Sequence, residues 1–130
     1  MTEWIGIINY PGSNCVAETV RYFSSLKYVI RIISHADDTV DLDGLILLVL
    51  PGGFAFGDRV YNKATERYDI APGRMATQCP VISIINKAVA LQIPILGICN
   101  GFQILTHMKI LPGQLVLNDS KRFECKKVKV

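Results

Sequence analysis

Cys99 is the residue of this chain whose surroundings best suit chemistry. It stands in Gly97-Ile98-Cys99-Asn100-Gly101, a Gly-x-Cys-x-Gly motif between the apolar run 94–98 and an apolar-faced segment. In a nucleophile elbow, a sharp turn from strand to helix exposes the nucleophile above the sheet, and small residues on both sides let the chain pass closely. The free N–H groups of the following helix favour the thiolate. We therefore predict that Cys99 is a nucleophile.

A glycine pair could assist such a nucleophile. Pro51-Gly52-Gly53-Phe54 ends another apolar run, 45–50. The ends of parallel strands meet at one edge of a sheet, where ligands gather. The backbone N–H of Asn100 and an unobstructed N–H from the glycine turn could then stabilise an oxyanion formed on a carbonyl under attack.

The other cysteines give no sign of a second reactive site. Cys15, Cys79 and Cys125 form no Cys-x-x-Cys pair, so neither a disulfide framework nor a zinc site is indicated. Cys15 precedes a helical segment but lacks the glycine frame. We predict a structural role for Cys15 and packing roles for Cys79 and Cys125.

The elements that must position Cys99 follow from short, β-branched apolar runs that alternate with helical patterns. We expect strands at 4–9, 28–33, 45–50 and 94–98, with a further strand at 123–130. Helices are expected from a cap at Ser13 or Asn14, at 81–91 and at 102–108. The polar segment 57–73 has no period and reads as a loop. The fold class is α/β, a three-layer, mostly parallel sheet with helices on both faces and flavodoxin-like topology.

Composition excludes several classes of protein. Of the 130 residues, 50% are hydrophobic and 19% are charged, with a net charge of +3, which is not the composition of a disordered chain. The longest apolar run is too short to cross a bilayer, and no secretory signal is visible. The basic residues between 121 and 129 alternate with apolar ones, as on a solvated strand face, so we expect no nucleic-acid or membrane partner. A cytoplasmic location is expected.

Three motifs together resemble a known family. They are Pro11-Gly12-Ser13-Asn14-Cys15, the stretch from Pro51 to Asp58, and the stretch from Gly97 to Leu105. Leu111-Pro112-Gly113 followed by Asn118 also fits. The chain is similar to the class I, triad-type glutamine amidotransferases, and among them to the glutaminase subunits of phosphoribosylformylglycinamidine synthases of purine biosynthesis.

The resemblance implies a reaction. Cys99 would attack the side-chain amide of glutamine, giving a γ-glutamyl thioester and ammonia. A synthetase subunit, with a small third subunit in the complex, would use the ammonia to convert formylglycinamide ribonucleotide to formylglycinamidine ribonucleotide. ATP and Mg would belong to that synthetase, so no cofactor or metal is expected here. The oxyanion and substrate-binding positions implied are Gly52, Gly53, Asn100 and Gln103.

The sequence also departs from the family. The triad's His and Glu, which follow well after the elbow, have no counterpart before Val130. His107 would lie about 12 Å from Cys99 along one helix, and His35 follows a strand expected far from the elbow. We expect residues 1–130 to be a single amidotransferase-like domain that is incomplete at its C-terminus. Segment 59–76 is longer than in the family.

Two alternatives remain. The chain could be a catalytically inactive amidotransferase-like fragment, or a regulatory or docking subunit. It could also belong to the intracellular-protease and deglycase-like branch of cysteine-elbow proteins. In much of that branch a histidine directly follows the nucleophile, and here Asn100 does.

Overall fold

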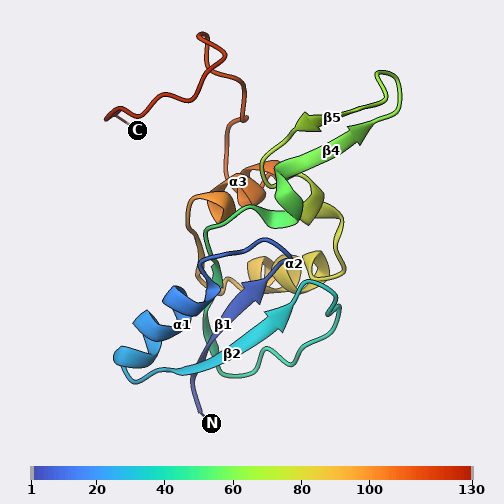
Figure 1. The fold of residues 1–130 in the computed structure, drawn as a ribbon. Coiled ribbons are helices and arrows are strands. Elements are labelled where there is room, and N and C mark those ends of the chain that lie inside the picture. The colour runs from blue at the N-terminus through green and yellow to red at the C-terminus, as the bar shows by residue number, and fades with distance from the viewer. Residues whose placement is uncertain (1, 130) are drawn as a thin grey trace.

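The central feature of the protein is a parallel sheet. The computed structural model describes residues 2–129, and their sheet has the strand order β2-β1-β3-β6 (Figure 1). The strands are β1 (Trp4–Asn9), β2 (Val29–Ser34), β3 (Leu45–Leu50) and β6 (Ile95–Gly97). All three pairings are parallel. The four expected strands are confirmed to within one residue at either end, because each is a short apolar run that the sheet buries.

The alternation of side chains along the strands divides the core into two layers. Trp4, Ile8 and Leu48 pack with residues of α2 (Ile82–Ala90) and α3 (Asn100–His107) on one face. Ile5, Ile7 and Val49 pack with Phe23 of α1 (Val16–Ser25) on the other. Figure 1 shows α1 apart from α2 and α3. The α/β fold with helices on both faces is thereby confirmed.

The start of α1 differs from expectation. Neither Ser13 nor Asn14 caps this helix. Its first helical residue is Val16, and Cys15 stands at the N-cap position with no side-chain cap bond. The backbone before it is held by other bonds: the Ser13 N–H donates to Tyr10 O at 2.9 Å, and the Cys15 N–H donates to Gly52 O at 3.2 Å. These contacts fix the conformation of the loop, so the helix begins only at Val16.

The polar segment predicted to be a loop is an ordered hairpin. Strands β4 (Arg59–Asn62) and β5 (Arg67–Ile70) pair antiparallel, between short 3₁₀ turns at Ala55–Asp58 and Met75–Gln78. Tyr61 lies opposite Tyr68, with ring centroids 5.2 Å apart. The hairpin extends away from the sheet (Figure 1). The loop prediction was wrong because every residue of β5 is exposed, so no apolar alternation marks the strands.

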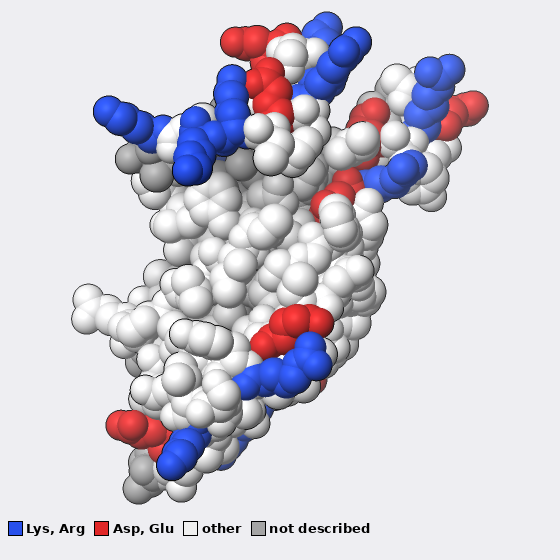
Figure 2. Space-filling model, turned by 60° about the vertical axis from the view of Figure 1, so that its left-hand side comes forward, with Lys and Arg blue, Asp and Glu red and all other residues white. Residues whose placement is uncertain are grey.

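The strand expected at 123–130 is absent from its described part. Residues 123–129 have no strand, and Val130 lies outside the described residues. The side chain of Phe123 is 91% exposed. An extended segment becomes a strand only when it pairs, and here the charges bond locally, as in the Lys126–Glu124 ion pair at 2.6 Å. Figure 2 shows charged side chains gathered on this tail, on the hairpin and at the opposite end, with a largely uncharged surface between.

Tyr10 carries an unsatisfied hydroxyl in the core. The residue is 2% exposed, and its hydroxyl has no hydrogen-bond partner among residues 2–129. Burial, with a smaller effect of Cys79, raises the pKa of Tyr10 far above its ordinary value. Its ring packs edge-on against Phe56, with centroids 6.3 Å apart.

Replacing Tyr10 with phenylalanine should therefore stabilise the fold. The ring contacts remain and the desolvated hydroxyl is removed, so we expect a gain of about 1 kcal/mol in the free energy of unfolding. Urea denaturation measures it. Tyr22→Phe serves as the matched control, because Tyr22 is 61% exposed. A loss of stability in Tyr10→Phe alone would show that the hydroxyl has a partner.

Candidate active site at the carboxyl edge of the sheet

Cys99 lies at a sharp turn between a strand and a helix. Strand β6 ends at Gly97 and α3 begins at Asn100, so that Cys99 is the N-cap residue, with φ 53° and ψ −107°. Few L residues adopt such a conformation, and strained positions of this kind cluster at functional sites. The Cys99 side chain is exposed. The strand–turn–helix geometry predicted for this motif is confirmed, and the catalytic role of Cys99 stays a prediction.

Close backbone contacts explain the glycines of the motif. A Cβ on Gly101 would lie 2.0 Å from the carbonyl oxygen of Leu50, at the end of β3. A Cβ on Gly97 would lie 2.7 Å from Leu105 Cδ1. Only glycine at position 101 lets α3 start directly against the end of β3. The motif thus places Cys99 beside the turn that follows β3.

That turn, Pro51-Gly52-Gly53-Phe54, lies against the loop after β1. Gly53 has φ +143°, and a Cβ there would lie 2.5 Å from Asn14 N. The Phe54 N–H donates to Gly12 O at 2.6 Å, which holds the two loops together. Gly52 is next to Cys99, because a Cβ on Gly52 would lie 3.6 Å from Cys99 Cβ and equally far from Cys15 Sγ. The structure therefore brings the glycine pair to the predicted nucleophile.

The backbone N–H groups of Gly53 and Asn100 are unused donors. Among residues 2–129 neither N–H donates a backbone hydrogen bond. Gly53 belongs to the turn beside Cys99, and Asn100 directly follows it. Two such donors next to an exposed thiol are what an oxyanion on an attacked carbonyl needs.

The side chain of Asn100 joins three parts of the site. It is 1% exposed. Its Oδ1 accepts from the Ala55 N–H at 3.0 Å, and its Nδ2 donates to Asp58 Oδ1 at 2.9 Å and to Gln103 Oε1 at 3.1 Å. Gln103 is thus next to the other predicted site residues. Asp58 had no predicted role; its only sequence signal is its position at the end of the glycine-rich loop.

Neither histidine is placed to serve Cys99. The His107 ring Nε2 lies 2.9 Å from Pro72 O. His35 follows β2 and packs against Phe56, with ring centroids 5.7 Å apart. Strands β1 and β3 separate β2 from β6, which at about 4.8 Å per strand amounts to about 14 Å. The positions agree with the expectation that both lie out of reach of the thiol.

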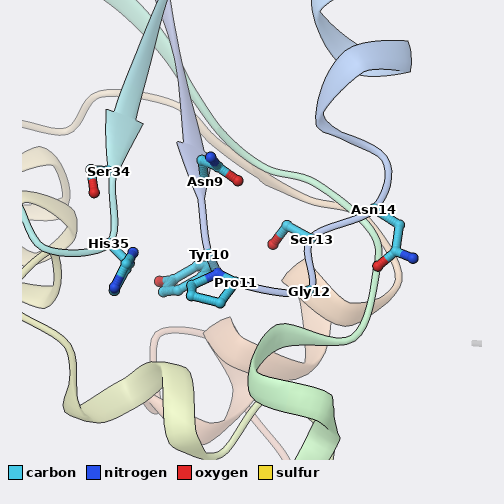
Figure 3. A pocket seen from close by; sticks show the side chains of 8 residues that line it. All are labelled: Asn9, Tyr10, Pro11, Gly12, Ser13, Asn14, Ser34 and His35. Atoms are coloured by element: carbon cyan, nitrogen blue, oxygen red, sulfur yellow. The ribbon is translucent and has the colours of Figure 1, made fainter.

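A separate hollow lies at the ends of β1 and β2. In Figure 3 the His35 ring lies beside Tyr10 and Pro11, with Ser34, Asn9 and Ser13 around the opening. None of the predicted site residues lines it. Its wall includes the loop that contacts Gly53, so it adjoins the candidate site without containing Cys99.

Of the three cysteines predicted to have structural or packing roles, Cys15 and Cys125 are exposed and Cys79 is half-buried. Burial raises the pKa of the Cys79 thiol. Residues 2–129 contain no cluster of His, Cys, Asp or Glu side chains that could hold a metal ion. No helix within this range has the length and apolar character needed to span a membrane.

Comparison with known proteins agrees with this geometry. Residues 3–130 match the CobB/CobQ-like glutamine amidotransferase domain. Because the match extends over nearly all of the chain, the protein belongs to this family of glutamine amidotransferase domains.

Individual relatives show which members of this family the chain resembles. The chain is 39% identical over 127 residues to the phosphoribosylformylglycinamidine synthase subunit PurQ of Thermosynechococcus vestitus, a match covering 95% of this chain and 47% of that subunit. It is 40% identical over 123 residues to PurQ of Pseudothermotoga lettingae, covering 92% and 47%. The solved structure of PurLQS from Thermotoga maritima matches with a TM-score of 0.77 and 34% identity, over 97% of this chain and 53% of that one. The chain thus spans about half the length of these relatives.

Proposed function

We propose that this chain carries the nucleophile of a glutamine amidotransferase of the PurQ type. The observation that supports it most is the exposed Cys99, strained at the start of α3, beside two unused N–H donors. The Cys99 sulfur bonds to the side-chain amide carbon of glutamine, and the carbonyl oxygen becomes an oxyanion held by the N–H groups of Gly53 and Asn100. The C–N bond then breaks, and the nitrogen takes a proton and leaves as ammonia. Water later cleaves the γ-glutamyl thioester to glutamate.

A general base must complete this chemistry. A positioned base and acid supplies roughly 10²–10⁴-fold, and neither His35 nor His107 is placed for the task. The resemblance assigns the task to a His and a Glu that follow the elbow in the family. We propose that full activity requires these groups from outside residues 1–130.

The positions of the two histidines also favour a second function. A chain that keeps the glycine turn and Cys99 but lacks a base could act as a regulatory or docking subunit. Its fold would present the same surface to a partner without supplying ammonia. The glutaminase rate discussed below distinguishes the two functions.

The relatives suggest which kind of protein would use the ammonia. The similar curated proteins are synthase subunits, and the similar solved structure is of PurLQS. We propose that the ammonia is consumed by a synthetase subunit that aminates formylglycinamide ribonucleotide in the cytoplasm. ATP and Mg belong to that synthetase, and a small third subunit completes the complex.

Competition labelling of the thiols tests the nucleophile. At neutral pH, limiting iodoacetamide should modify Cys99 first, because its thiol is exposed in the strained turn before α3. Cys79 should react more slowly, since burial raises its pKa. Cys15 is the real competitor, because it is also exposed and also stands at the N-cap position of a helix. Peptide mass spectrometry gives the order. Labelling of Cys15 before Cys99 would show that the elbow gives no added reactivity.

A further inference from the structure

The two proposed oxyanion donors belong to separate pieces of the chain. The Asn100 N–H is part of α3, whereas Gly53 lies in a turn outside the sheet and the helices. Their separation decides whether both can reach one oxygen atom. We propose that the side chain of Asn100, bonded to Ala55 and Asp58, is the positioning residue that sets this separation. The inference rests on the proposed function.

Two hydrogen bonds of the Asn100 side chain support this positioning role. Asn100 Oδ1 accepts from the N–H of Ala55, which lies two residues after Gly53. Asn100 Nδ2 donates to Asp58 Oδ1, at the far end of the same turn. One residue thus supplies an oxyanion donor from its backbone and holds the loop bearing the other donor with its side chain. A shift in the loop would change both bonds.

The loop between Ala55 and Asp58 has a strained backbone, so it depends on hydrogen bonds to keep its conformation. Phe56, Gly57 and Asp58 have φ values of 56°, 71° and 55°, and residues other than glycine rarely adopt this left-handed conformation. Bonds to Gly12 and Pro11 fix the loop to the segment after β1. The Asn100 side chain ties it to α3, the helix that follows Cys99. Asp58 Oδ1 also accepts from the N–H of Gly73, which follows the hairpin, at 3.1 Å.

The bonds are directional, which separates positioning from mere packing. The Ala55 N–H can only donate, so the Asn100 amide must turn its oxygen to Ala55 and its NH₂ to Asp58. Asn100→Asp keeps the shape and the bond from Ala55. It loses the donor, however, and sets a second carboxylate beside Asp58 in a buried position, where like charges repel. The bridge, by which we mean the hydrogen bonds from the side chain at position 100 to Ala55 and Asp58, should then open.

A reciprocal exchange restores the bridge. In the double variant Asn100→Asp with Asp58→Asn, the carboxylate at position 100 accepts from Ala55 and from the new amide at position 58. The native Asp58 Oδ1 accepts from both Asn100 and the Gly73 N–H, so the double variant gives up the bond from Gly73. Gln103 can turn its own NH₂ toward position 100. The pair has the same volume and total charge as the native one. If only packing mattered, Asn100→Asp would leave the site unchanged, and the double exchange would have nothing to restore.

The experiment compares two rates of Cys99 modification in the 130-residue chain. A chloroketone analogue of glutamine and iodoacetamide both form an S–C bond and release halide. Only the first holds a carbonyl where the proposed oxyanion donors lie. The ratio of the two rates cancels any change in thiolate population, so it reports on the oxyanion donors and not on reactivity in general. Peptide mass spectrometry measures both rates, and circular dichroism confirms that each variant is folded.

The variants should differ in the ratio of the chloroketone rate to the iodoacetamide rate. Asn100→Asp and Asp58→Ala should lower the ratio about tenfold or more, as for a displaced oxyanion donor. The double exchange should raise the ratio at least about threefold above that of Asn100→Asp, because it restores the bond between positions 100 and 58 without the bond from Gly73. Asn86→Asp, which adds the same charge at an exposed position on α2, should leave it unchanged. If Asn100→Asp fails to fold, Asp58→Ala and the double exchange still decide the result.

Two results would overturn the inference. Folded Asn100→Asp or Asp58→Ala with a native ratio would show that the bridge does not position the donors. A folded double variant as impaired as Asn100→Asp would show that the bonding pattern is irrelevant. A different result bears on the proposed function itself: if the native chain reacts with iodoacetamide at Cys99 but not with the chloroketone, that function and this inference both fail.

Discussion

Glutamine hydrolysis by the 130-residue chain should be slower by about 10²–10⁴-fold than hydrolysis by a PurQ-type enzyme with its own general base. The proposed nucleophile and both proposed oxyanion donors lie within the chain, but His107 is engaged with Pro72 and His35 lies about three strand spacings from the elbow strand. Glutamate release, measured with the PurLQS complex of Thermotoga maritima as reference, gives the rate.

A Cys99→Ser variant is the control for this measurement. Residual glutamate release that disappears in Cys99→Ser belongs to the proposed site. A rate close to that of the reference complex, abolished by the same substitution, would mean that a base exists within these residues. His35 would then be the residue to test next. No detectable release from either chain, with or without a synthetase, would favour the docking function.

Gly101→Ala should have the largest effect on stability. The added methyl group would lie 2.0 Å from the carbonyl oxygen of Leu50 and 2.7 Å from the Leu50 carbonyl carbon. Both atoms are backbone, so α3 itself must move away from β3. We expect a loss of about 3 kcal/mol or more in the free energy of unfolding, together with loss of the preferred reactivity of Cys99. Urea denaturation and iodoacetamide labelling measure the two effects.

Gly113→Ala is the matched control for Gly101→Ala. Gly113 lies in a bend after α3, with φ +100°, and a Cβ there would meet nothing within 4 Å. Its substitution should therefore cost only the conformational strain, about 1 kcal/mol. Equal losses in the two variants would mean that the contact between α3 and β3 is less tight than the structure shows.

The sequence was most informative where burial determines structure. The run 45–50 is apolar throughout because β3 is covered on both faces, and its bounds were predicted to the residue. The elbow was predictable because a strained turn between two packed elements demands glycine at both flanking positions. Contacts of this kind leave a local pattern of residue types.

The rest depended on contacts between distant segments. Strand β5 is exposed along its whole length and β4 is only half-buried on one face, so no clear apolar alternation marked the hairpin. The strand expected near the C-terminus failed because pairing depends on a partner strand. The bridge from Asn100 to Ala55 joins residues 45 positions apart. Nothing in the local sequence of either residue indicates it.

The most direct test of the account is protection of Cys99 by glutamine. The chloroketone analogue of glutamine is incubated with the 130-residue chain, and the adducts are located by peptide mass spectrometry. We expect one adduct, at Cys99, whose formation is slowed by added glutamine and not by asparagine, which is one methylene shorter. Modification that begins at Cys15, or that proceeds at Cys99 regardless of glutamine, would contradict the claim that Cys99 is a nucleophile directed at glutamine.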